Sequence, residues 1–214
     1  MKRTVVSALK LVDGRLMCKG KSGRMYSVFK KQGDLDGACA IYSVIMNLLI
    51  LGTINGSDTE LEAKHNNPDT KRLFHEFCER YGLHREGHYF DEIKRMLSKS
   101  FGKVVKVAPP SDTINMASVD VISQTILKYD IPVVMQVTGH AMLAVGVELE
   151  NDVTTKILCL DPNGDYMNRT NKRWNAEVQI IRDGRTTYKY KSKIEGAYYK
   201  VNTRLGEVLV ISKK

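Results

Sequence analysis

The run of apolar residues at 38–51 is the feature that most constrains the fold of this chain. A polar loop with glycines and aspartates precedes the run, and Gly52 follows it as a stop signal for a helix. A segment that is apolar on nearly every face is typical of a helix buried all round, and this one is shorter than the ~20 residues of a membrane span. We therefore expect a central core helix that carries Cys39 in its first turn.

Cys39 is a candidate nucleophile because of its place at the start of that helix. Free backbone N–H groups and the positive end of the helix dipole favour a thiolate over a thiol there. The alternative is a structural role, since free cysteines are among the most often buried residues and behave as small hydrophobes. A partner that can act as a base is needed to decide between the two interpretations.

Length and composition indicate a single globular domain over 1–214. The 214 residues suffice for one good core, and contents of 43% hydrophobic and 27% charged residues are ordinary for a folded chain. The four cysteines lie far apart, so we expect reduced thiols. The N-terminus lacks the apolar core of a signal peptide, so we expect a cytoplasmic protein without membrane attachment.

The net charge of +9 has two interpretations. An acidic partner or a nucleic acid would suit a basic chain, and small basic clusters such as 19–24 occur. The basic residues are otherwise spread along the chain, and no stripe of aromatic and basic residues is present, which disfavours nucleic acid. A solvated basic surface is the favoured interpretation.

Residue periodicity predicts an α+β fold. An N-terminal β-meander within 1–31 should have strands at 4–11, 16–19 and 25–29. After the Cys39 helix, helices are expected at 71–81 (capped by Asp69 or Thr70 and packed on the central helix), 90–98 and 116–129, with a short strand at 104–107. Later strands are expected at 133–137, 141–149, 155–160, 176–181, 186–191 and 208–211. Helices thus dominate the N-terminal half, around the Cys-bearing helix, and an antiparallel β-sheet the C-terminal half.

His140 is the candidate base among the five histidines. It follows a Thr-Gly pair and starts a strand, so its ring lies at a strand end where a site can open. With the next turn centred on 150–151, His140 lies directly opposite Asp161, with Cβ atoms ~4.5–5.5 Å apart. The carboxylate can then bind one imidazole nitrogen while the other faces the thiol, as a thiol-imidazole-carboxylate triad requires. Asn163 is the alternative orienting residue.

Two donors are candidates for stabilising the oxyanion of an acyl-transfer intermediate. The backbone N–H of Cys39 supplies one at the helix start, and the side-chain amide of Gln32 can supply the second. Taken singly, Gln32 is also typical of a solvated loop, His140 of a strand-end histidine and Asp161 of a turn before proline. Their order along the chain, Gln, Cys, His, Asp, favours a joint catalytic role.

This pattern resembles the papain-like cysteine peptidases, most closely the branch typified by the double-glycine leader peptidases of bacterial export systems. The resemblance implies a papain-like fold with catalytic Cys39 and His140, an orienting Asp161 and an oxyanion-stabilising Gln32. The chain departs from the family in having alanine on both sides of the cysteine and one more residue between glutamine and cysteine. The N-terminal meander and the tail after Ile181 are not explained by it. The resemblance is most specific over 32–47 and 139–164.

A second constellation, His75, Cys78, His84 and His88, has ligand types at spacings that could suit zinc. Cys78 lies on the apolar stripe of its predicted helix, however, and the last two histidines lie in a polar loop. We therefore expect no metal, and no cofactor is implied.

The sequence predicts a cysteine peptidase that hydrolyses a peptide or protein amide bond through a Cys39 thioester. The same triad can perform deamidation or acyl transfer, because the outcome depends on what attacks the thioester. The alternative from another class is a catalytically inactive papain-like domain that binds a peptide or protein partner.

Overall fold

The apolar run forms helix α1 (Cys39–Ile50), in which every residue except Tyr42 is buried. The computed structural model describes residues 1–33, 38–59, 68–76, 89–108, 116–166, 172–181, 186–191 and 198–214. The helix is followed by Gly52 with a φ of 63°, a left-handed conformation that glycine adopts without strain. The prediction of a buried core helix with Cys39 in its first turn is confirmed.

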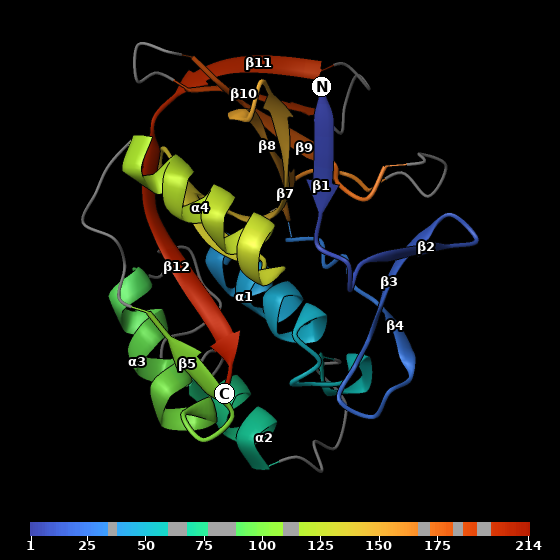
Figure 1. The fold of residues 1–214 in the computed structure, drawn as a ribbon. Coiled ribbons are helices and arrows are strands. Elements are labelled where there is room, and N and C mark those ends of the chain that lie inside the picture. Colours follow the sequence, from blue (N-terminus) through green and yellow to red (C-terminus); the bar gives the residue numbers. More distant parts are fainter. Residues whose placement is uncertain are drawn as a thin grey trace.

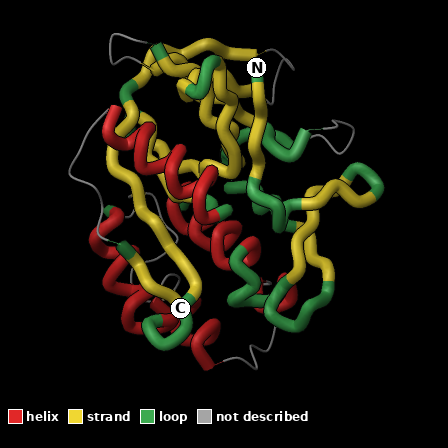
Figure 2. The backbone as a smooth tube through the Cα atoms, in the orientation of Figure 1, coloured by secondary structure: helices red, strands yellow, loops and turns green. Residues whose placement is uncertain are grey.

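Nine strands of the described part of the chain form one sheet, and every pairing within it is antiparallel. The order is β11-β10-β9-β8-β7-β6-β12-β5, and β1 pairs with the part of β7 that lies beyond β6 (Figures 1 and 2). The predicted mixed α+β chain with an antiparallel sheet is confirmed. The strands are β1 (Lys2–Val5), β5 (Val105–Val107), β6 (Val133–Val137), β7 (His140–Glu150), β8 (Val153–Leu160), β9 (Ala176–Ile180), β10 (Thr186–Lys191), β11 (Tyr198–Thr203) and β12 (Leu205–Lys213).

The helices pack on the middle and one end of this sheet. Helix α1 and helix α4 (Met116–Tyr129) both contact β6 and β7, while α3 (Phe90–Phe101) contacts β5 and β12 (Figure 1). The bounds of α4 match the prediction, and α3 runs three residues beyond it. No helix within the described ranges is both long and apolar enough to cross a membrane.

Helix α2 (Pro68–Phe74) begins earlier than predicted. Asp69 and Thr70 lie inside its first turn, so the prediction that either residue caps the helix is wrong. Proline is well suited to the first helical position, because its fixed φ is helical and the N–H that it lacks would have no partner there. The rest of the predicted helix, with Phe77, Cys78 and Tyr81, and its docking on α1 lie outside the described residues.

The N-terminal region forms the predicted meander only in part. Strands β2 (Lys10–Val12), β3 (Arg15–Lys19) and β4 (Met25–Ser27) make a separate three-stranded antiparallel sheet. The predicted strand at 4–11 is wrong, because the chain bends at Ser7, whose backbone N–H and hydroxyl both donate to the carboxylate of Asp130. Residues before the bend form β1 in the large sheet, and residues after it form β2.

The hairpin of β7 and β8 turns at Asn151 and Asp152, which have φ values of 49° and 61°. Two central residues with positive φ are characteristic of a tight type I′ turn, so the predicted centre at 150–151 is wrong by one residue. The ladder contains two β-bulges, one with Thr155 as the extra residue on β8 and one with Val145 as the extra residue on β7. Because one bulge lies on each strand, their shifts in register cancel at the end of the hairpin that carries His140.

Two other strands depart from the sequence-based expectation. Strand β11 was not predicted, and β12 is longer than 208–211 because it continues through an irregularity between Leu205 and Val208. The irregularity contains Gly206 and Glu207, which interrupt the apolar alternation that marks a strand in a sequence.

Candidate active site

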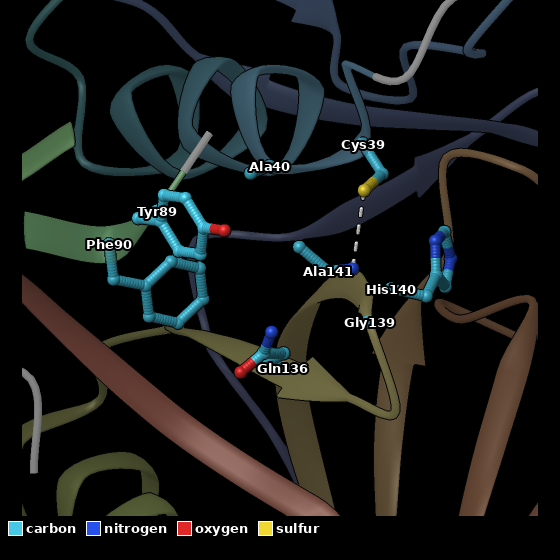
Figure 3. A pocket seen from close by; sticks show the side chains of 8 residues that line it. All are labelled: Cys39, Ala40, Tyr89, Phe90, Gln136, Gly139, His140 and Ala141. Carbon is cyan, nitrogen blue, oxygen red and sulfur yellow. Dashed lines mark hydrogen bonds between the residues drawn. The ribbon is translucent and has the colours of Figure 1, made fainter. Parts of the chain in front are cut away.

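Three residues at a spacing of four along α1 attach this helix to the backbone at the starts of β6 and β7. The Ser43 hydroxyl donates to the backbone carbonyl of Ala141 at 3.4 Å, and the Asn47 amide donates to the carbonyl of Pro132 at 3.0 Å. Cys39 lies on the same stripe, because residues four apart share one face of a helix. Its sulfur accepts a hydrogen bond from the backbone N–H of Ala141 at 3.3 Å (Figure 3). Polar residues at this spacing in an otherwise apolar helix are the sequence signal that marks this face.

His140 is the first residue of β7, directly after a two-residue turn. Thr138 and Gly139 both have positive φ, of 42° and 75°, so β6 and β7 are joined by the tightest kind of hairpin. The Nε2 atom of His140 lies 2.7 Å from Oδ1 of Asp161. Since Nε2 is engaged by the carboxylate, Nδ1 is the nitrogen left for the thiol of Cys39.

Asp161 follows the last residue of β8 and is held by Asn175. Its backbone N–H donates to the Asn175 side-chain oxygen at 2.8 Å, and the Asn175 amide donates back to the Asp161 carbonyl at 2.9 Å. The backbone N–H of Asn163 donates to Asp161 Oδ1 at 2.9 Å. The side chain of Asp161 is only 1% exposed, so these contacts and His140 define its orientation. Sequence reasoning missed Asn175, which lies 14 residues away and meets Asp161 only because β8 pairs with β9.

The two remaining candidates lie at the edge of this arrangement. Asn163, the alternative orienting residue, contributes the backbone contact described above. Gln32 is half-buried, and its backbone N–H donates to the carbonyl of Pro162 at 2.8 Å, so its loop runs beside the turn that carries Asp161. Gln32 is absent from the described residues that line the cavity at Cys39, and its oxyanion role stays a prediction.

The electrostatics of the site favour an ion pair. Burial raises the pKa of the Cys39 thiol, but hydrogen bonds from His140 and the Ala141 N–H, together with the charge of His140, bring it below the usual 9.0. Burial lowers the pKa of His140, but hydrogen bonds to Asp161 and Cys39 and their negative charges raise it from 6.5 to about 10. Both shifts favour the thiolate of Cys39 and the imidazolium of His140 over the neutral pair.

The other described cysteines lack these contacts. Burial raises the pKa of the Cys18 thiol to about 11, and burial together with nearby carboxylates raises that of Cys159 well above 9.0. Both side chains are inaccessible to solvent. Of these three thiols, Cys39 alone combines a lowered pKa with an opening to the surface.

A cavity of about 210 Å³ opens beside Cys39 and His140 (Figure 3). The rings of Tyr89 and Phe90, at the start of α3, form one wall, and the side chain of Gln136 projects from β6 below them. None of these three residues was singled out from the sequence, because each is far from Cys39 along the chain. The remaining lining residues are small or belong to the site itself: Cys39, Ala40, Gly139, His140 and Ala141.

The described residues contain no group of three or more His, Cys, Asp or Glu side chains that could hold a metal ion. Of the four residues considered as zinc ligands from the sequence, only His75 is among the described residues. Cys78, His84 and His88 lie outside them.

Comparison with known proteins adds a likeness of fold. No protein-family model matches the chain, and no curated protein matches it. The crystal structure of UfSP from C. elegans is similar over 100% of this chain and 34% of that one, with a TM-score of 0.52 and 15% sequence identity. The fold is similar to that of a papain-like protease. At this identity the likeness concerns the fold alone, and it does not single out the double-glycine branch, which stays a prediction.

This chain spans about a third of the length of the UfSP chain that it matches. The activity, substrates and partners of the whole of that protein therefore do not carry over, and the function of this chain is argued from its own residues.

Proposed function

We propose that this protein hydrolyses an amide bond of a peptide or protein through a thioester on Cys39. One observation carries the proposal. The imidazole of His140 is fixed by Asp161 at 2.7 Å, while the neighbouring N–H of Ala141 binds the Cys39 sulfur at 3.3 Å. The proposed nucleophile and base thus line one cavity, and the buried carboxylate of Asp161 binds the base. This arrangement supports covalent acyl transfer.

The first chemical step is acylation of the thiolate. The Cys39 sulfur attacks the carbonyl carbon of the scissile amide and forms a tetrahedral intermediate. His140 donates its Nδ1 proton to the amide nitrogen, the C–N bond breaks, and an amine leaves while a thioester remains. The Asp161 carboxylate keeps the ring in the orientation that directs Nδ1 at the reacting atoms and stabilises its charged form.

The second step is hydrolysis of the thioester. Neutral His140 now accepts a proton at Nδ1 from a water molecule, whose oxygen attacks the thioester carbon. The C–S bond breaks, a carboxylic acid leaves, and the thiolate and imidazolium are restored. No further reactant is needed.

The oxyanion of both tetrahedral intermediates requires hydrogen-bond donors. The backbone N–H of Cys39 is suited to this, because the first N–H groups of a helix have no partner within the helix and the helix dipole favours negative charge there. Gln32 is the proposed second donor.

The size of the cavity favours a side chain as its occupant. Small-molecule sites usually have volumes of ~300–1,000 Å³, whereas this cavity measures about 210 Å³. Aromatic walls and one amide suit a single substrate side chain next to the scissile bond. This supports a peptide or protein substrate.

The test is cleavage of a mixed library of fluorogenic peptide amides by the wild-type protein and by Cys39→Ala. We expect Cys39→Ala to lower the rate by at least ~10³-fold with the fold unchanged, because alanine is well tolerated in a helix. Cys18→Ala is the matched control, since it removes a buried thiol without touching the site, and it should keep near wild-type activity.

Product analysis decides between hydrolysis and related reactions. Hydrolysis in water enriched in ¹⁸O places one labelled oxygen in the new carboxyl group of a shortened peptide. A peptide of unchanged length in which an amide group has been hydrolysed to a carboxyl group, with release of ammonia, would indicate a deamidase instead. Full activity of a folded Cys39→Ala protein would remove the proposal.

A further inference from the structure

A second cavity, of about 340 Å³, is lined by residues from the other end of α1 and from the strands β2, β3 and β4. We call it the Lys10–Lys19 pocket. Its helix spans 12 residues at ~1.5 Å each, so the pocket lies roughly 18 Å from the end that carries Cys39. Both lysines line it, and its apolar lining residues are Ala8, Met25, Ile50 and Leu51.

The strand register explains why lysines and an exposed methionine meet here. Leu16 and Cys18 of β3 are buried on one face of the small sheet. Lys19 therefore lies on the other face, directly opposite Met25 of β4, and Lys10 of β2 shares this face. Met25 is 38% exposed, so part of its apolar side chain is accessible to a partner. The face thus combines uncovered apolar surface with two ammonium groups.

The two charged residues that line the pocket, Lys10 and Lys19, are both basic. Residues 10–31 contain seven Lys or Arg and a single acidic residue, Asp13, a net charge of +6 out of +9 for the whole chain. No acidic side chain lines the pocket. Within the described ranges, neither Lys10 nor Lys19 forms an ion pair. The complementary surface is therefore an acidic one.

The pocket is held by contacts between the small sheet and the chain after α1. The Cys18 thiol donates to the carbonyl of Leu49 at 3.2 Å. The N–H of Lys21 donates to the carbonyl of Ile54 at 3.1 Å, and that of Ser22 to the Asn55 side chain at 2.8 Å. A pocket that is already formed loses little conformational freedom on binding.

The aromatic residues of this region disfavour nucleic acid as the occupant. The Tyr26 ring lies against Gly20 and Gly56, where an added Cβ would come within 2.7 and 2.4 Å of it. The ring of Phe29 packs on Tyr166 with centroids 5.5 Å apart. Neither ring is free to stack on a base, and binding of single strands depends on such platforms.

We propose that the Lys10–Lys19 pocket binds an extended acidic segment of a partner protein. One apolar side chain of the segment enters the cavity and packs on Met25, whose flexible thioether adapts to different shapes. Carboxylates on either side of it pair with Lys10 and Lys19, whose long stems reach them without a fixed geometry. This binding is independent of the reaction at Cys39.

The test is fluorescence anisotropy with the Cys39→Ala protein, which cannot cleave the probe. The probe is a fluorescein-labelled peptide with one leucine between two pairs of glutamates. We expect Lys10→Ala/Lys19→Ala to weaken binding by about tenfold or more and the matched double variant Lys103→Ala/Lys106→Ala by less than about twofold. Replacing leucine by glycine in the probe should also weaken binding.

A second variant keeps the test decisive if removing both lysines affects folding. Met25→Trp takes up space beside the position proposed for the leucine but keeps both charges, so it should abolish the preference for the leucine probe over the glycine probe. An unchanged preference overturns the proposal, as does an equal loss in the Lys103/Lys106 control. A twelve-nucleotide oligothymidine that binds more tightly than the peptide, and is lost with Lys10 and Lys19, would establish a nucleic-acid site instead.

Discussion

Asp161 binds Nε2 of His140 although it does not lie directly opposite the histidine in the β7–β8 ladder. The position opposite His140 lies two residues further along the chain. Leu143 pairs with Leu160, and continuing this register opposes His140 to Asn163. A displacement by an even number of residues keeps side chains on one face, and diagonal neighbours remain within reach of long side chains. The predicted direct opposition was therefore wrong, although the contact it was meant to produce is present.

The first prediction separates the two residues that this register brings near His140. Asp161→Asn should lower kcat/KM by ~10²-fold or more, because the amide keeps the shape but loses the charge that stabilises the imidazolium. Asn163→Ala should change it by less than about threefold, since Asn163 contributes its backbone N–H, which alanine retains. Both are measured on one peptide substrate. A severe Asn163→Ala beside a near-normal Asp161→Asn would reassign the third residue.

The second prediction concerns thiol reactivity. At neutral pH Cys39 should be alkylated by iodoacetamide much faster than Cys18 or Cys159, because its pKa is lowered whereas theirs are raised. Rates are obtained for each cysteine by peptide mass mapping over time. His140→Ala should remove the advantage of Cys39. Faster labelling of Cys18 or Cys159 would mean that the nucleophile has been misplaced.

The third prediction is the pH dependence of kcat/KM. Acylation needs the thiolate of Cys39 and the imidazolium of His140 together, so activity should fall at low pH as the thiolate gains a proton. It should also fall at high pH as His140 loses its proton near its raised pKa of about 10. Asp161→Asn removes a cause of that elevation, so the alkaline limb should move to lower pH. An alkaline limb that stays in place would mean that Asp161 does not raise the pKa of His140.

The fourth prediction tests how Asp161 is positioned. Asn175→Ala removes both hydrogen bonds to the backbone of Asp161 and should lower kcat more than it changes KM. Gly164→Ala provides a second route to the same effect, because its Cβ would come within 2.9 Å of the Asn175 amide nitrogen. Both variants should move the alkaline limb of the pH profile in the same direction as Asp161→Asn. A loss of thermal stability without that shift would indicate a purely structural role.

Local sequence signals were enough for much of the fold and for the positions of three candidate site residues. The apolar run predicted α1 and the position of Cys39 in it, because burial on every side requires apolar residues at every position. A histidine after a Thr-Gly turn and an aspartate at a strand end before proline marked His140 and Asp161. Each of these signals lies within a few residues of the feature that it predicts.

The remaining features depend on contacts between distant segments. The link from Asn175 to Asp161 exists only because β8 and β9 pair, and the Tyr89 wall of the cavity exists only because the start of α3 reaches the cavity that Cys39 and Gln136 also line. The bend at Ser7 likewise needs Asp130 from the end of α4. A single sequence carries no sign of such pairings, because the residues involved are ordinary polar and aromatic types.

The two bulges of the β7–β8 hairpin, one on each strand, together keep the side chains of His140 and Asp161 on the same face of the sheet, as the proposed reaction requires. Losing Thr155 or Val145 alone would change the count between His140 and Asp161 by one and turn the carboxylate to the opposite face of the sheet. Losing both would restore the match. A deletion in one strand of the hairpin is therefore tolerated only together with a deletion in the other strand. A relative with a single deletion there would keep the same three residue types without the contact between histidine and aspartate.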